Sequence, residues 1–296
     1  MIFNITTWGV SGLRLKRFTL FFVLLLVLGA CGETSSQNQN SDEKGSGKWA
    51  EIKENGELVV GTPGTLYPAS YYPEGSDELT GYDVEVIKEI AKRLDIDVKF
   101  EILGFDAMLA SLKSGRIDVA QAGLREASKK KFAFSDPYKY SYSTMIVRKD
   151  EVADFKTLAD LDGKKAGGAA TTVYSDIARK FGAEVKTYGN VTNDVYLKDV
   201  DNGRTDVIIN DYYLQSLALE AFPDLDITIH PDLKFYPTTQ NVVMDKDADL
   251  LKEKINEVLA GMREDGTLTE LSGKFFGGKD VSKKPDEDII EIEGIE

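Results

Sequence analysis

A short segment of the chain occurs twice, and this repeat constrains the fold more than any other feature. Ser114-Gly115-Arg116-Ile117-Asp118-Val119 is echoed by Asn202-Gly203-Arg204-Thr205-Asp206-Val207, with the two glycines 88 positions apart. Both copies follow an amphipathic segment, so the glycine can end a helix and Asp-Val can open a strand. Coincidence of a common helix-Gly-strand junction is the alternative. We expect two similar α/β lobes, because 296 residues also exceed the usual size of one domain.

Apolar patterning around the first copy supports alternating strands and helices. Leu58–Gly61 has the pattern of a short strand that ends in a Gly-Thr-Pro-Gly turn. From Asp83 onward apolar residues recur at helical spacing, and Glu89 can pair with Arg93 one turn later. Further on we expect a strand at Val98–Ile102, a helix at Asp106–Ser114 and a strand at Ile117–Ala122. This alternation predicts a largely parallel sheet covered on both faces.

Residues 1–30 have the order of an export signal. Arg14, Lys16 and Arg17 precede the apolar run Phe18–Leu28, which is too short to span a bilayer. Leu28-Gly29-Ala30-Cys31 then resembles the lipobox of bacterial lipoproteins. We therefore expect a signal peptide, with the single cysteine as the lipid attachment site of an extracytoplasmic protein held at the cell membrane. An uncleaved anchor helix is the alternative.

Composition limits the two ends of the chain and the kind of partner. After the cysteine, residues 32–48 carry no apolar residue and are expected to form a flexible tether. Residues 279–296 are acidic after Pro285 and are expected to be a frayed tail. A net charge of -14 without a basic run argues against a nucleic-acid partner. The folded body is therefore expected from Trp49 to Gly278.

Polar residues follow both repeated strands. The first delivers Gln121, Gly123 and Arg125 to its carboxyl end, and the second delivers Asn210 and Asp211. Ligands of open α/β sheets lie beyond the carboxyl ends of the strands. If the lobes face each other, a cation on one side and a carboxylate on the other could close over a small zwitterion. This predicts a binding cleft between the lobes.

Several ordered motifs resemble one protein family. Gly81-Tyr82-Asp83-Val84-Glu85-Val86, Phe134-Ser135-Asp136-Pro137-Tyr138 and Glu264-Asp265-Gly266-Thr267-Leu268 are similar to motifs of the family 3 extracellular solute-binding proteins, which serve amino-acid ABC transporters. The resemblance implies an α/β, type II periplasmic-binding-protein fold, whose two lobes are joined by two hinge strands and close around the ligand.

The same resemblance implies how the chain is divided and what it binds. Hinge strands are expected near Ile146–Lys149 and Thr238–Val242, with lobe 1 in residues 49–147 plus 240–278 and lobe 2 in residues 148–239. The partners implied are an amino acid and an ABC permease, for a monomer that needs no cofactor. Similarity to the branch that binds cystine and other sulfur amino acids lies in Lys139–Ser143, Gly168–Tyr174 and Asn210–Leu214.

Individual ligand contacts are implied residue by residue. Phe105 matches the aromatic that packs on the ligand side chain, with core packing as the alternative. Asp211 matches the acid that binds the α-ammonium, with a solvated turn carboxylate as the alternative. Thr172 matches a hydroxyl contact and Thr171 lies beside it, although either could instead cap the following helix.

Two positions depart from the family pattern. Tyr67 lies near the opening aromatic of the family, but Leu66 occupies the aligned position. In the family, an arginine a few residues before the Phe-Ser-Asp segment usually binds the α-carboxylate. Counting back from Phe134, this chain has Ser128 at that position. We expect Arg125 to take that role and Ser128 to leave room for it, because lysine or serine cannot copy a bidentate arginine. A ligand without a free α-carboxylate is the alternative.

An enzyme on the same bilobal fold, such as a dehydratase, is the first alternative function, and a ligand-sensing module is the second. His230 is the sole histidine, and no partner for general-base catalysis is evident beside it. The sequence contains no HExxH, GxSxG or phosphate-loop motif. We therefore expect a binding protein rather than an enzyme, without a metal site.

Overall fold

The computed structural model describes residues 42–123 and 126–295. The predicted signal peptide, the lipid attachment site Cys31, most of the predicted tether and Arg125 lie outside the described residues. Within the described ranges, no helix combines the length and the apolar character needed to cross a membrane.

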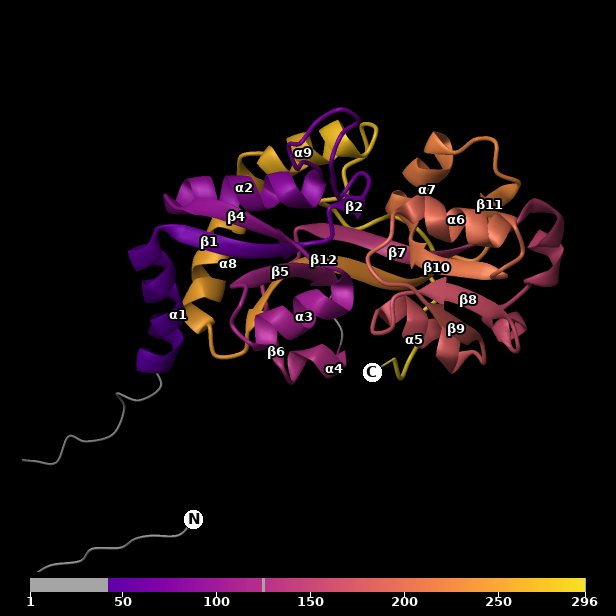
Figure 1. The fold of residues 1–296 in the computed structure, drawn as a ribbon, viewed down its shortest axis with the longest axis horizontal. Helices are drawn as coiled ribbons and strands as arrows, with labels where there is room; N and C mark the ends of the chain where they lie inside the picture. Colours follow the sequence, from indigo (N-terminus) through magenta and orange to yellow (C-terminus); the bar gives the residue numbers. More distant parts are fainter. Residues whose placement is uncertain (1–41, 124–125, 296) are drawn as a thin grey trace, which may run out of the picture. The chain divides into compact units, whose positions relative to one another are not determined.

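Helices and strands alternate along the chain (Figure 1). The helices are α1 (Asp42–Asn55), α2 (Tyr82–Leu94), α3 (Phe105–Lys113), α4 (Glu126–Lys129), α5 (Val173–Lys180), α6 (Asn193–Asp201), α7 (Tyr212–Ala221), α8 (Asp249–Glu264) and α9 (Thr267–Phe275), with 3-10 turns η1 (Lys149–Asp154) and η2 (Leu158–Leu161). The strands are β1 (Glu57–Thr62), β2 (Thr65–Leu66), β3 (Ser70–Tyr71), β4 (Asp97–Ile102), β5 (Val119–Gly123), β6 (Phe132–Phe134), β7 (Lys139–Arg148), β8 (Lys165–Gly168), β9 (Glu184–Thr187), β10 (Val207–Asp211), β11 (Ile227–Ile229) and β12 (Phe235–Asp245).

A mixed sheet runs through both lobes in the order β4-β1-β5-β12-β7-β10-β8-β9. In the first lobe β1 pairs in parallel with β4 and β5, and in the second β8 pairs in parallel with β9 and β10. Between these groups β7 and β12 are antiparallel to their neighbours. The predicted α/β fold with two lobes and two hinge strands is confirmed, although the parallel sheet is interrupted where the lobes join.

The repeated segment has the same structural role in each lobe. The glycine of each copy follows a helix with a left-handed φ, 73° in the first and 70° in the second. The Oδ2 atom of Asp118 accepts a hydrogen bond from the backbone N–H of Val59 at 2.8 Å. In the second copy Asp206 accepts from the N–H of Lys165 at 2.7 Å. Each aspartate directly precedes a strand, and its hydrogen bond connects the start of that strand to the neighbouring parallel strand.

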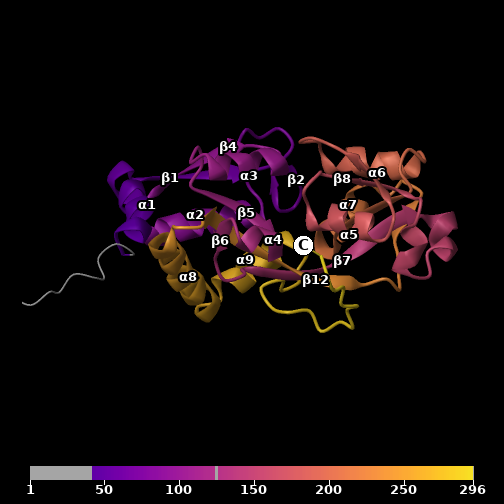
Figure 2. The same ribbon diagram turned by 90° about the horizontal axis from the view of Figure 1, so that it is seen from below.

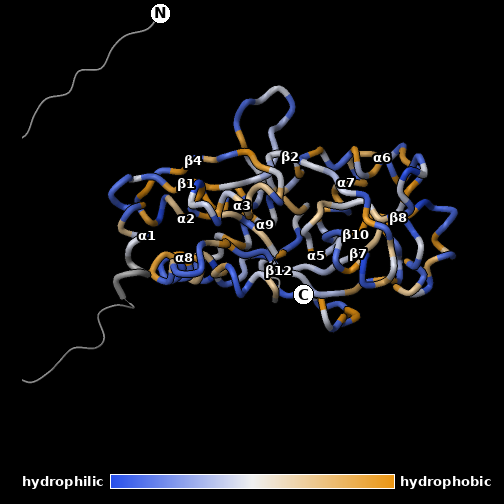
Figure 3. The backbone as a smooth tube through the Cα atoms, turned by 60° about the horizontal axis from the view of Figure 1, so that its bottom comes forward, coloured by the Kyte–Doolittle hydropathy of each residue, from blue (hydrophilic) through white to orange (hydrophobic). Residues whose placement is uncertain are grey.

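Helices cover both faces of the sheet in each lobe (Figures 1 and 2). In the first lobe α2, α8 and α9 pack with Leu58 and Val60 of β1, and α3 packs on the opposite face with Val59. In the second lobe α5 covers one face of β10, and α6 and α7 cover the other. Along α8 hydrophobic and hydrophilic residues alternate in the manner of a half-buried helix (Figure 3).

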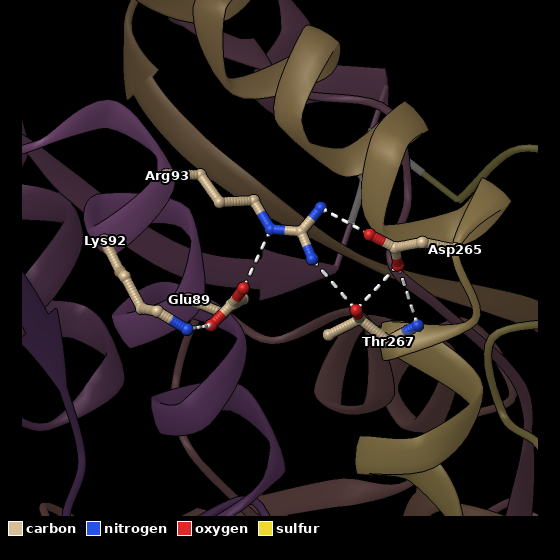
Figure 4. Close-up of polar contacts among 5 residues, drawn as sticks. All are labelled: Glu89, Lys92, Arg93, Asp265 and Thr267. Carbon is tan, nitrogen blue, oxygen red and sulfur yellow. Dashed lines mark hydrogen bonds and ion pairs between the residues drawn. The ribbon is translucent and has the colours of Figure 1, made fainter.

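A polar network connects α2 to the beginning of α9 (Figure 4). Glu89 accepts hydrogen bonds from Arg93 Nε at 2.8 Å and Lys92 Nζ at 3.0 Å. The same guanidinium reaches Asp265 at 2.8 Å and Thr267 at 2.9 Å. The predicted pair between Glu89 and Arg93 is confirmed. Each exposed ion pair of this kind contributes about 0–1 kcal/mol, so the network orients the helices more than it stabilises the fold.

The folded body begins earlier than predicted. Helix α1 starts at Asp42, inside the segment expected to be a tether. Its Lys48 forms an ion pair with Asp118 at 2.6 Å, and Ile52 is almost fully buried in the first-lobe core. Residues 42–48, which lack apolar side chains, are therefore the first turns of a helix whose later turns pack against the core.

The prediction of a frayed acidic tail is wrong for the described residues 279–295. Val281 is fully buried in the first-lobe core, and Ile295 is buried in the second-lobe core. Between them Ile290 exchanges backbone hydrogen bonds with β12 and its preceding loop, through Tyr236 N–H and Lys234 O. We call residues 279–295 the C-terminal strap, because they pack against both lobes.

Strands β7 and β12 pair where they pass between the lobes, with Lys139–Ser143 opposite Phe235–Gln240. The expected hinge at Thr238–Val242 overlaps this paired segment. The other, at Ile146–Lys149, lies beyond it, because Val147 already packs in the second-lobe core. We propose that β7 enters the second lobe near Ser143, a few residues before the expected boundary.

Candidate functional site

A cavity of about 200 Å³ lies between the lobes, at the carboxyl ends of β5 and β10. This is the place predicted for the ligand. Six of the predicted residues line it: Phe105, Gln121, Gly123, Thr172, Asn210 and Asp211. The hinge strands β7 and β12 also contribute side chains to its wall. A movement of one lobe against the other would therefore change the shape of the cavity.

Three predicted contacts are not part of the lining. The ring of Tyr67 is 43% exposed and packs edge-on against Tyr71, while Leu66, the aligned residue, lines the cavity. Ser128 is half-buried in α4. Thr171 is exposed, and its hydroxyl donates a hydrogen bond to a carboxylate of α3 in the opposite lobe.

Phe105 and Thr172 each line the cavity and also have a structural role in their own lobe. Phe105 lines the cavity and also packs against the core between α3 and β5. Thr172 lines the cavity and is the N-cap of α5, where its Oγ1 accepts from the N–H of Ser175 at 3.3 Å. A Cβ at Gly123 would lie 3.1 Å from Thr239 O, which is a tight contact.

A buried ion pair joins the hinge to the second lobe. Lys139 Nζ of β7 lies 2.6 Å from Asp211 Oδ2, and each side chain is only 10% exposed. The other carboxylate oxygen of Asp211 accepts from the backbone N–H of Leu214 at 3.0 Å, which caps α7. The acid expected to bind an ammonium therefore already has a cationic partner within the protein.

A second carboxylate, that of Asp83, faces the same lysine from the first lobe. Its place is set by Gly81, where a Cβ would lie 2.3 Å from Ala69 O, so that α2 can begin beside the cavity. Burial raises the pKa of Asp83 to about 6, while the charge of Lys139 and hydrogen bonding with Tyr138 and Gln240 oppose that shift.

Sequence reasoning did not assign Asp83 or Lys139 to the site. Both were visible as charged residues within family-like motifs, but a motif does not show which way a side chain points. Asp83 lies in the first turn of α2 and Lys139 at the start of a hinge strand. Charge inside otherwise apolar or aromatic surroundings is the signal that could have identified them.

Direct contacts join the lobes beside the cavity. Asn190 of the second lobe donates from Nδ2 to Pro63 O at 3.0 Å, and its Oδ1 accepts from Thr65 Oγ1 at 3.1 Å. Asp106 of α3 accepts the hydroxyl of Thr171 across the same boundary. The structure therefore has the lobes in contact around the cavity, as expected for a closed state.

His230 lies apart from the cavity lining. It is buried, with Nε2 3.2 Å from Val152 O and Nδ1 accepting from the N–H of Leu233 at 3.2 Å. Both ring nitrogens are thus used to hold neighbouring backbone in place. Across residues 42–123 and 126–295, histidine, cysteine and carboxylate side chains form no group of three suited to a metal ion.

Known proteins share both the sequence and the fold. The probable ABC transporter extracellular-binding protein YckB of Bacillus subtilis is 54% identical over 280 residues, which cover 93% of this chain and 96% of YckB. The crystal structure of YckB has a TM-score of 0.66, at 56% identity, and covers 83% of this chain and 99% of that one. The L-cystine-binding protein TcyA of the same species is 35% identical, over 89% of this chain and 97% of TcyA.

A further solved structure carries a bound amino acid. The substrate-binding protein AbpA of Streptococcus pneumoniae, bound to L-arginine, has a TM-score of 0.70 at 28% identity, and covers 77% of this chain and 98% of its own. Residues 58–278 match the family described as bacterial extracellular solute-binding proteins, family 3. The chain belongs to this family.

Proposed function

We propose that this protein is the substrate-binding component of an amino-acid ABC importer. The observation that supports this most strongly is the cavity between the lobes, which carries two buried carboxylates and a buried lysine. Relatives with this fold include a cystine-binding protein and an arginine-bound protein. Our best candidate ligand is L-cystine or another sulfur amino acid.

Capture proceeds by lobe closure. In the open state water reaches the cavity, and in the closed state Asn190 holds the second lobe against Pro63 and Thr65. Closure removes solvent, so fixed polar groups act on the ligand in a medium of lower effective dielectric constant. Ligand that binds this state better than the open one shifts the population toward closure.

The remaining contacts are proposed from their positions. Phe105 packs on the ligand side chain, Thr172 offers its hydroxyl, and Asp211 contributes to the polar end of the cavity. Arg125 supplies the bidentate contact to the α-carboxylate, with Ser128 leaving it room. Mutation of Arg125 to Ala should then weaken calorimetric affinity for the natural ligand; unchanged affinity would exclude this role.

Delivery requires that the protein stay near its permease. We propose that acylated Cys31 anchors a monomer to the outer face of the cell membrane, and that residues 32–41 are the tether. Replacing Cys31 with Ser should release the protein from the membrane fraction into the medium. Retention of the variant on membranes would contradict the lipid anchor.

The decisive test of the function is a thermal-shift screen of the purified protein against the twenty standard amino acids, L-cystine and short peptides. A ligand that binds only the folded protein raises Tm by mass action. Failure of every compound to raise Tm would refute an amino-acid binding role. Chemical turnover of a compound that binds would favour the enzyme alternative, which we do not propose.

A further inference from the structure

Resting on the proposed function, we propose that Asp83 and Gln121 form the seat for the ligand's ammonium group, and that Lys139 permanently occupies the place beside Asp211. The family resemblance alone gives that place to the ligand. The ligand class is therefore a compound with a free primary ammonium group, which is received by the first lobe rather than the second.

Asp211 has little capacity left for a ligand. Lys139 Nζ lies 2.6 Å from its Oδ2, and the N–H of Leu214 donates to its Oδ1 at 3.0 Å. Both partners belong to the protein and are held by β7 and by the first turn of α7. Separating the two buried charges to admit a ligand would leave one of them unpaired, which is strongly unfavourable.

Two other acceptors at the cavity each keep one oxygen without a donor, although Asp83 also interacts with Tyr138 and Gln240. Asp83 is 7% exposed and Gln121 is 5% exposed, and both line the cavity. In the part of the chain that the structure describes, no donor meets hydrogen-bond geometry at Asp83 Oδ1 or at Gln121 Oε1. Buried acceptors are normally paired, so a donor-rich group from outside the protein is the partner that fits.

Other hydrogen bonds hold the side chains of Asp83 and Gln121 in position. Gln121 Nε2 donates to the backbone O of Asp83 at 2.5 Å and to Tyr138 Oη at 3.1 Å. Asp83 Oδ2 accepts from Gln240 Nε2 at 3.1 Å. The two unused oxygens therefore come from side chains held by β5, β12, α2 and the loop residue Tyr138, as a preorganised binding site requires.

The net charge of the cavity side chains favours an ammonium group as the donor. When Asp83 and Asp211 are both ionised, Lys139 neutralises one of them, and the three side chains carry a net charge of -1. A single ammonium completes the balance, whereas a neutral donor would leave a buried negative charge. An ammonium can also donate to both unused oxygens at once.

The test compares variants of the two acids. Asp83→Asn keeps the shape but removes the charge, Gln121→Met removes the second acceptor, and the double variant Lys139→Met with Asp211→Asn removes the internal pair together. Each is screened by thermal shift and calorimetry with L-cystine and the twenty standard amino acids. A charge-assisted hydrogen bond lost from a buried site weakens binding roughly ten- to a hundredfold.

We expect that loss in Asp83→Asn, and smaller losses in Gln121→Met and in the double variant, which keeps the Asp83 carboxylate. Wild-type-like affinity in Asp83→Asn, with binding abolished in the double variant, would show that Asp211 binds the ammonium and would overturn the proposal.

A second measurement needs no ligand. An unpaired buried carboxylate destabilises the ligand-free protein, so Asp83→Asn should raise its Tm by a few degrees. A lower Tm would identify Asp83 as a structural group and overturn the proposal even if no amino acid bound. If no amino acid binds the wild type but Asp83→Asn still has a higher Tm, the proposed function is refuted, whereas the inference of an unpaired buried carboxylate at Asp83 is supported.

Discussion

Replacing Lys139 with Met tests the electrostatics of the cavity directly. The side chain keeps most of its volume but loses the charge that faces Asp83 from one lobe and Asp211 from the other. Removing one member of a buried ion pair typically costs about 3–5 kcal/mol, because the remaining charge is left without a partner. We expect a loss of stability in this range at pH 8.

The pH dependence gives a sharper expectation. Burial raises the pKa of Asp83 from 3.8 to about 6 in the wild type. A carboxyl group with a raised pKa binds its proton more tightly in the folded state. Stability is therefore lost as pH rises from about 4 to 6, and the loss is complete above that. At 1.36 kcal/mol per pKa unit, this ionisation destabilises the wild type by about 3 kcal/mol at pH 7.

In the variant the window moves upward. Lys139 is the main group that opposes the raised pKa of Asp83, so its removal places that pKa above 6. Stability should then continue to fall between pH 6.5 and 8, where the contribution of Asp83 in the wild type is already constant. The neighbouring Tyr82 and Tyr138 stay neutral over this range, because burial raises the pKa of each phenol well above its ordinary value.

Urea unfolding at pH 5, 6.5 and 8 measures both effects. Lys113→Met, at an exposed position of α3, controls for the loss of one lysine. Adding Asp83→Asn to Lys139→Met should remove the extra slope above pH 6.5. Parallel stability curves for wild type and Lys139→Met over that interval would refute the electrostatic coupling of these three residues.

Three further outcomes follow from contacts elsewhere in the chain. Asp118→Ala and Asp206→Ala should each cost about 1–3 kcal/mol in urea unfolding, because each leaves a backbone N–H without its acceptor; a large effect from one and none from the other would contradict the equivalent roles of the repeat. Asn190→Ala should increase the radius of gyration of the ligand-free protein in small-angle X-ray scattering, and an unchanged radius would show that these bonds do not hold the lobes together. Ile295→Ala should cost about 2 kcal/mol, with Glu293→Ala as the exposed control, and equal stability of the two variants would mean that the strap does not pack in solution.

Local sequence predicted the elements well but not their long-range partners. The helix–Gly–Asp–Val pattern identified both lobes, because each copy specifies a helix end and a strand start within a few residues. Lys139 and Asp211 are far apart in the chain, and only the pairing of β7 with β10 brings them together. Their ion pair could not be predicted from residue spacing.

The strap was missed for a different physical reason. Its acidic residues gave it the composition of a solvated tail, and this hid Ile292 and Ile295, which pack against the second lobe. Exposed Glu291 and Glu293 flank the half-buried Ile292, as in a half-buried extended segment. Net charge describes the side chains facing water and not those facing the protein.

The C-terminal strap also determines when the second lobe can complete its folding. Ile295 belongs to the second-lobe core, whose other members come from β7 through β12. Synthesis proceeds from the N-terminus to the C-terminus, so Ile295 is added only after every strand of the second lobe. The core of the second lobe therefore cannot be complete until the strap has been made.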